Sequence, residues 1–323
     1  MPKREWRQAI HRGGRWIKHK RLPESINSPH AGLLPVGFSA EHLGPNDYYY
    51  WDNFWGVAGL RAAAKLLEAF GEERLSEEFQ QEAETLMAAV ERSLEITVSR
   101  RCRRGMSASP YRRMDAGAIG SLAVGYPLQL WPPHDRRLLD TAEFLMDRCF
   151  VDGGFFQDMI HSGINAYLTL HVAQVLLRAE DPRFFDLVRV VAEQASPTGQ
   201  WPEAIHPHTG GGCMGDGQHV WASAEWILMM RNCFVREEGD HLVLASGIPK
   251  SWLDQEKILS LGPTLTPYGA ISISIRPEPQ KVFVAWKAAW RMKEPIIEIH
   301  LSGFPPVTVP QGETAIEFGR EGA

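Results

Sequence analysis

Residues 76–98 read SEEFQQEAETLMAAVERSLEITV and decide the first step of the fold. Apolar side chains recur here every three or four residues, at Phe79, Ala83, Leu86, Met87, Val90 and Leu94. That spacing places them on one face of an α-helix and leaves the charged residues on the other. The stretch therefore predicts a long amphipathic helix that packs against other helices.

Further helical patterns surround this segment. They predict helices over 4–19, 52–70, 115–126, 135–149, 163–179, 219–235 and one beginning at Asp181-Pro182. The connectors alternate between short ones and four long ones, which we name loop A (20–51), loop B (99–114), loop C (150–162) and loop D (196–218). In antiparallel helical hairpins, connectors of one parity emerge on one face. We therefore expect the four long loops to share a face that carries the function.

From residue 239 onward the apolar period changes to two, which is typical of strands. Strands are predicted over 241–245, 270–275, 281–286, 296–301 and 315–318. The sequence thus predicts a mainly α fold, an incomplete α/α toroid over 1–236, followed by a small antiparallel, sandwich-like β module over 237–323.

The composition limits the possible functions. The chain has 323 residues, 44% of them apolar, and a formal net charge of −5. With no basic excess and no apolar run of membrane length, we predict neither a nucleic-acid nor a membrane partner. Four cysteines without CxxC spacing favour a reducing cytoplasm. No cofactor and no metal are predicted, because the spacing of His206, His208, Cys213 and His219 fits no recurring zinc pattern.

Loop A and the start of the next helix read GFSAEHLGPNDYYYWDNFW over 37–55, with six aromatic residues among the last eight. Aromatic rings stack on the apolar faces of sugars, while carboxylates and amides bond to their hydroxyls. Asp52 is therefore a candidate catalytic acid, with Glu41 in reserve, and Trp51 and Trp55 are candidate walls of a binding site. The alternative is that Asp52 caps the following helix and the rings form core.

Loop D and the start of the last helix read TGQWPEAIHPHTGGGCMGDGQHVW over 198–221. Glu203 lies among aromatic rings, and partial burial of such a carboxylate raises its pKa toward that of a catalytic acid or base. Trp201, His206 and Trp221 are candidate substrate contacts. The alternative is that Glu203 forms a salt bridge within a flexible glycine-rich loop.

The other two long loops contribute further candidate substrate contacts. Loop B contains Arg113 and ends just before Asp115, and loop C contains Asp158 and His161. Both acids precede a predicted helix, so helix capping is the alternative for each.

Two motifs carry a resemblance to a known family. Tyr50-Trp51-Asp52-Asn53-Phe54-Trp55 is the first, and Pro202-Glu203-Ala-Ile-His206-Pro-His208-Thr209-Gly210, followed by His219-Val-Trp221-Ala-Ser-Ala, is the second. They resemble the acid and base segments of the six-hairpin (α/α)₆-barrel glycosidases, which include glucoamylases, trehalases and processing α-glucosidases. The resemblance implies an inverting, α-glucosidase-like glycoside hydrolase that acts on a small oligosaccharide or α-glucan. It assigns Asp52 as general acid and Glu203 as general base.

The helix count leaves other functions open. Eight helices are visible where the barrel of this family has twelve, so the chain resembles the C-terminal part of the barrel. Alternatives are a catalytically weak or inactive carbohydrate-binding fragment or subunit, and a sugar phosphorylase or epimerase on the same fold. Besides a carbohydrate substrate, we expect self-association or an upstream barrel segment to cover the apolar residues of the first helix, Trp6, Ile10, Trp16 and Ile17.

Overall fold

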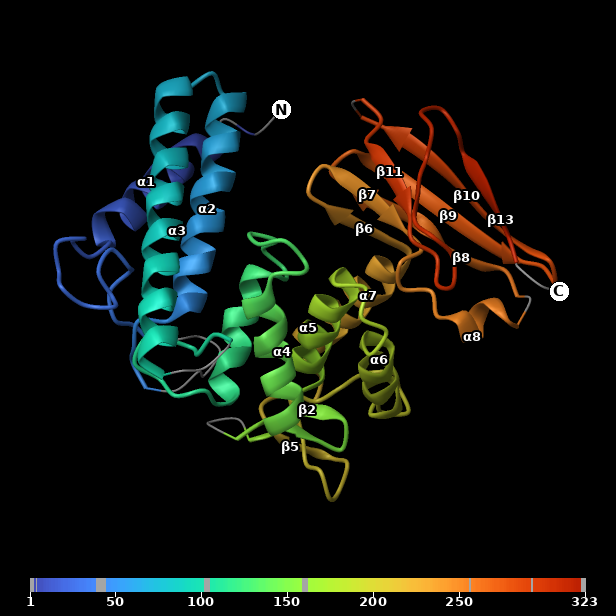
Figure 1. The fold of residues 1–323 in the computed structure, drawn as a ribbon, viewed down its shortest axis with the longest axis horizontal. Helices are drawn as coiled ribbons and strands as arrows, with labels where there is room; N and C mark the ends of the chain where they lie inside the picture. The colour runs from blue at the N-terminus through green and yellow to red at the C-terminus, as the bar shows by residue number, and fades with distance from the viewer. Residues whose placement is uncertain are drawn as a thin grey trace. The chain divides into compact units, whose positions relative to one another are not determined.

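The computed structural model describes residues 3, 5–38, 45–101, 105–158, 162–255, 257–291 and 293–320 (Figure 1). The chain divides into two compact units. Unit 1 comprises residues 1–175 and 202–217, and unit 2 comprises residues 176–201 and 218–323. Helices dominate up to Phe234 and strands dominate after it, which confirms the predicted mainly α fold with a small β module.

The helices follow the predicted segments closely. Unit 1 holds α1 (Trp6–Lys20), α2 (Tyr50–Ala69), α3 (Glu73–Arg101), η1 (Ala116–Val124), α4 (Arg136–Arg148) and most of α5 (Ala166–Arg178). Unit 2 holds the end of α5, α6 (Phe184–Glu193), α7 (Val220–Phe234) and α8 (Lys250–Leu253). Across the described ranges, no helix combines the length and the apolar character needed to cross a bilayer.

The hairpin of α2 and α3 forms the core of unit 1 (Figure 1). Its central cluster includes Val57, Leu60 and Leu67 from α2 and Phe79, Ala83 and Leu86 from α3. The last three belong to the amphipathic stripe read from residues 76–98, and all three are fully buried. The apolar period therefore predicted both the helix and its buried face.

The segment 115–126 forms a 3₁₀ helix, η1, rather than the predicted α-helix. Gly117 and Gly120 weaken an α-helix because glycine loses more backbone entropy than other residues on folding. Every residue of η1 is buried. Packing against the surrounding residues, and not an intrinsic helix propensity, therefore stabilises this tighter helix.

Helix α1 packs on this hairpin through Ile10 and Ile17, whereas Trp6 and Trp16 stay 47% and 58% exposed. Half of the predicted apolar stripe is thus partly buried within the chain. The self-association or upstream segment expected to cover the rest remains a prediction.

We expect Gly14→Ala to destabilise unit 1 and Gly13→Ala to stabilise it. A Cβ on Gly14 would lie 2.1 Å from Cε2 of the buried Phe79, whereas a Cβ on Gly13 would have no neighbour within 4 Å. Overpacking costs about 1–3 kcal/mol, while exchanging a helical glycine for alanine gains about 1 kcal/mol. Urea unfolding of both variants measures the two shifts. Equal midpoints would show that α1 does not approach α3 as described.

Loop C, the two residues that follow it and loop D form a small sheet in unit 1 that the sequence did not predict. Its strands, in spatial order, are β1 (Phe150–Val151), β2 (Gly154–Gln157), β3 (Gly163–Ile164), β4 (Ala204–Ile205) and β5 (Gly212–Met214). All neighbours pair antiparallel, and Ile164 opposite Ile205 joins the two loops. Loop D is therefore held by backbone hydrogen bonds to loop C.

Two four-stranded sheets make up the β module of unit 2. One has the order β12 (Val307–Thr308), β11 (Ile296–Ile299), β7 (His241–Leu244), β6 (Val235–Glu238). The other has the order β13 (Ala315–Gly319), β10 (Lys281–Trp290), β9 (Gly269–Pro277), β8 (Leu259–Thr266). The pairs are antiparallel apart from β7 with β11, which is parallel. Ile271, Ile273 and Ile275 point inward and are buried, as their alternation with serines predicted.

The predicted domains, 1–236 and 237–323, stay a prediction. The change from helix to strand falls between Phe234 and Val235. The compact units divide the chain along other lines, because α6 and α7 belong with the strands of unit 2.

Candidate active site

Loops A and B meet through backbone and side-chain hydrogen bonds. The Tyr50 N–H donates to the Ala108 carbonyl at 3.0 Å, and the Ser109 hydroxyl donates to Asp47 Oδ2 at 2.7 Å. Nearby, the ring of His30 stacks on Tyr48 at 4.2 Å between centroids, and its Nδ1 lies 2.6 Å from the Tyr111 hydroxyl. These contacts fix the chain where it enters α2.

Asp52 lies in the first turn of α2 and does not cap it. The N-cap residue is Tyr49, which makes no side-chain cap hydrogen bond. Burial raises the pKa of the half-buried Asp52 carboxyl to about 6. No hydrogen bond or ion pair joins this carboxyl to any residue that the structure describes. Asp52 is thus a desolvated carboxyl whose raised pKa lets it hold its proton at a higher pH than an ordinary aspartate.

Two indole rings flank Asp52 in sequence and contact each other. The centroids of Trp51 and Trp55 lie 5.6 Å apart with an interplanar angle of 55°. Trp51 is half-buried and Trp55 is 42% exposed, so Trp55 in particular presents aromatic surface to solvent. The aromatic core of this segment is instead supplied by Tyr50 and Phe54, which are both fully buried.

Both backbone polar groups of Glu203, its N–H and its carbonyl, form hydrogen bonds. Its N–H donates to the Asp216 carbonyl at 2.9 Å, which closes loop D, and its carbonyl accepts from Asn165 Nδ2 at 2.8 Å. Carboxylate oxygens of Glu203 and Asp216 lie within 4.8 Å of each other. Asp216 is the residue that sequence reasoning missed. Closure of loop D brings Asp216 to Glu203. The only feature of the sequence that could have indicated this residue is its position as an acid between two glycines.

The Glu203 side chain lies directly against Gly215. A Cβ on Gly215 would come 1.9 Å from Glu203 Oε2, and the φ of Gly215 is +68°. Only glycine adopts this conformation without strain and leaves room for the carboxylate.

We expect Gly215→Ala to displace the Glu203 carboxylate and to lower any activity that depends on this carboxylate at least about tenfold, since small misplacements at a reacting centre are costly. Gly217→Ala is the matched control, because a Cβ there would have no neighbour within 4 Å. Activity and thermal melts of the two proteins separate displacement from unfolding. Unchanged activity in Gly215→Ala would contradict a role for Glu203 in its described position.

Asp115 is the N-cap of η1, as its capping alternative predicted. Its Oδ1 accepts from the Gly117 N–H at 3.0 Å, and its Oδ2 lies 3.3 Å from Arg112 Nη2 and 3.6 Å from Arg113 Nε. The Arg113 side chain is 83% exposed. Asp115 therefore has structural partners for both oxygens, whereas Arg113 can still reach a ligand.

Asp158 follows β2 and is exposed. It does not cap α5, which begins eight residues later at Ala166, because loop C continues as strand β3. Burial, with a contribution from the charges of Asp158 and Asp115, raises the pKa of the Cys149 thiol to about 11.

His206 is half-buried at the end of β4, where its Nδ1 accepts from the His208 N–H at 3.2 Å. Trp201 is a core residue in unit 2, not a stacking surface. It is 3% exposed, its Nε1 donates to the Val191 carbonyl at 2.7 Å, and its ring lies 5.3 Å from Trp226. Trp221 is half-buried in the first turn of α7. Glu41 and His161 lie outside the described residues.

Comparison with known proteins adds little. No protein-family model matches the chain, and no curated protein matches it significantly. One solved structure described as "Glycosidase Wild Type" matches with a TM-score of 0.38 and 21% sequence identity, over 54% of this chain and 51% of that one. The chain therefore spans about half the length of that glycosidase.

Proposed function

We propose that the chain is a glycoside hydrolase in which Asp52 is the general acid and Glu203 the general base. The observation that carries the proposal is the state of Asp52, a half-buried carboxyl without a described partner whose pKa burial raises to about 6. A general acid works best when its pKa is near the operating pH, because it must be protonated and still release its proton. An aspartate with an ordinary pKa near 4 would be ionised.

The proposed reaction is a single displacement with inversion. Asp52 transfers its proton to the glycosidic oxygen as the bond from that oxygen to the anomeric carbon breaks. On the opposite face of the sugar, water attacks the anomeric carbon while Glu203 takes one of its protons. Proton exchange with solvent then restores both carboxyl groups. This mechanism requires the two carboxyl groups to lie about 6.5–9.5 Å apart when substrate is bound.

The surroundings of both residues support this proposal. The exposed ring of Trp55 beside Asp52 offers the kind of surface on which a sugar face stacks. Asn165 and the turn at Gly215 hold Glu203, which satisfies the need for a supported catalytic group. The six-hairpin glycosidases that the sequence resembles include α-glucosidases, so α-linked glucosides are the substrates we propose to test first.

The test follows hydrolysis of maltose, trehalose and α-linked glucose oligomers by ¹H NMR, which resolves the two anomers of the released sugar. From trehalose we expect equal initial amounts of β- and α-glucose, because the attacked unit inverts and the leaving unit keeps its α configuration; from maltose we expect an early excess of β-glucose. Release of α-glucose alone from trehalose would replace inversion by retention, and binding without any turnover would favour the carbohydrate-binding alternative over the enzyme.

We expect kcat/KM to fall as the pH rises through about 6. The proton on Asp52 is required, and above its pKa the protonated fraction drops tenfold per pH unit. The pH profile on an unactivated disaccharide measures this basic limb. A rate that is flat from pH 5 to pH 8 would remove Asp52 from the role of acid.

A further inference from the structure

A pocket lies within unit 2, at the turn between α5 and α6, the turn before α8 and the segment after β11. Its volume is about 440 Å³, inside the usual range of about 300–1,000 Å³ for small-molecule sites. Its walls are largely apolar and include Phe184, Phe185, Ile248, Leu301 and Phe304.

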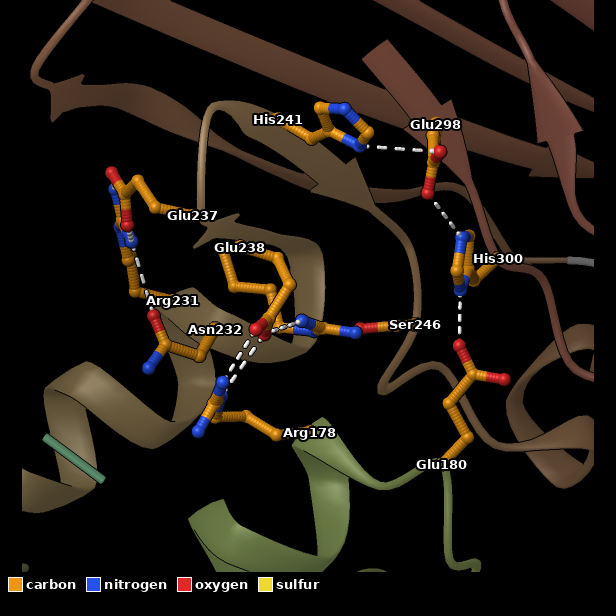
Figure 2. A network of polar contacts seen from close by, with 11 residues as sticks. Arg178, Glu180, Arg231, Asn232, Glu237, Glu238, His241, Ser246, Glu298 and His300 are labelled. Carbon is orange, nitrogen blue, oxygen red and sulfur yellow. Dashed lines mark hydrogen bonds and ion pairs between the residues drawn. The ribbon is translucent and has the colours of Figure 1, made fainter. Parts of the chain in front are cut away.

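One edge of the pocket is fixed by a row of alternating histidines and carboxylates (Figure 2). His300 is hydrogen-bonded through Nδ1 to Glu180, and its Nε2 lies 3.0 Å from Glu298 Oε2. Glu298 Oε1 in turn lies 3.3 Å from His241 Nδ1. The His300 side chain is only 17% exposed. Because both of its ring nitrogens are engaged, His300 holds Glu180 in place at the pocket.

A buried ionic network supports the neighbouring edge. Arg178 and Arg236 are both 4% exposed and both pair with Glu238. Arg236 Nε also donates to Ser246 Oγ at 3.1 Å, and Figure 2 shows Ser246 at the end of this network. Ser246 lines the pocket. Since its oxygen accepts from Arg236, its own hydroxyl hydrogen is left to donate to a ligand.

Three further polar groups line the pocket and can still form hydrogen bonds with a ligand. The second oxygen of Glu180, the ammonium of Lys250 and the hydroxyl of Ser302 have no hydrogen bond or ion pair with any residue in the described ranges. Together with Ser246 they offer both donors and acceptors. The charges of Glu180 and Lys250 oppose each other, so a ligand that carries a net charge of either sign meets one unfavourable group.

We propose that this pocket binds a neutral mono- or disaccharide and is a second carbohydrate site of the protein. A sugar combines an apolar face for the phenylalanine walls with hydroxyls that both donate and accept. The site needs no catalytic residue, and it stands whether or not the chain hydrolyses glycosides.

The test observes the histidine ring resonances of the full chain by NMR while D-glucose, maltose or cellobiose is added. The signal of His300 is identified by its loss in His300→Gln. An Asp52→Asn background prevents turnover. We expect the His300 signal to shift saturably with at least one of the three sugars, and Phe304→Ala to weaken that binding about tenfold. Phe283→Ala is the control, because this ring contacts Arg276 and Lys281 outside the pocket.

Phe304 also packs against Phe318, so a second variant guards against misfolding. Lys250→Met changes an exposed side chain and should weaken binding at least about threefold. The proposal is overturned if none of the three sugars shifts His300 saturably, if L-phenylalanine alone does so, or if the folded Lys250→Met protein binds as tightly as the parent. Saturation without hydrolysis in the parent chain would retain this site and reject the proposed enzyme.

Discussion

Asp52→Asn is expected to lower kcat on an unactivated disaccharide by about two to four orders of magnitude, the usual contribution of a positioned general acid. On a 4-nitrophenyl glycoside the loss should be far smaller, because this leaving group departs without a proton. Steady-state kinetics on both substrates measures the contrast. Glu68→Gln is the matched control, an exposed carboxyl on the same helix, and should leave both rates unchanged.

The same substitution should also stabilise the protein, which separates loss of chemistry from loss of fold. The folded pKa of Asp52, about 6, exceeds the unfolded value near 3.9. Between those values the folded state binds more protons, so the free energy of unfolding falls as the pH rises from about 4 to about 6. Asparagine removes this penalty. After allowance for solvent screening, we expect a gain on the order of 1 kcal/mol at pH 7 and little change at pH 4. Equal effects at both pH values would contradict a raised pKa.

Glu203→Gln is expected to lower kcat by about two to four orders of magnitude on both the disaccharide and the 4-nitrophenyl glycoside. A better leaving group does not replace the base, because water must still be activated in either case. This equal loss distinguishes Glu203 from Asp52. Glu193→Gln, an exposed carboxyl at the end of α6, serves as the control. Recovery of the rate with the activated substrate would assign Glu203 to the leaving group instead.

Helices and long strands were predictable because their apolar period extends over many residues. The stripe in α3 and the isoleucines of β9 are repeated often enough to exceed chance. Strands β3 and β4 have two residues each, too few to show a period. Strand β8 was missed because its register shifts between Leu261 and Thr264, and β6 because it continues directly from α7.

For the site, sequence supplied residue types but not their surroundings. Asp52 was recognisable as a candidate from the aromatic residues around it. That it does not cap α2 could be learned only from the structure, in which the helix already begins at Tyr50. Trp201 was expected to face a sugar because it adjoins a glycine-rich loop, but its indole is satisfied by Val191 and packed on Trp226. Burial of one ring in such a loop is decided by distant segments, which local sequence does not encode.

The pairing of Ile164 with Ile205, and the bond from Asn165 to the Glu203 carbonyl, also set a rule for engineering. Loops C and D form a single module, although the paired Ile164 and Ile205 lie about forty residues apart in the chain. Grafting loop D alone from another protein would leave strand β3 without its partner and Glu203 without its anchor. Loop exchanges should therefore transplant both loops together, as a matched pair.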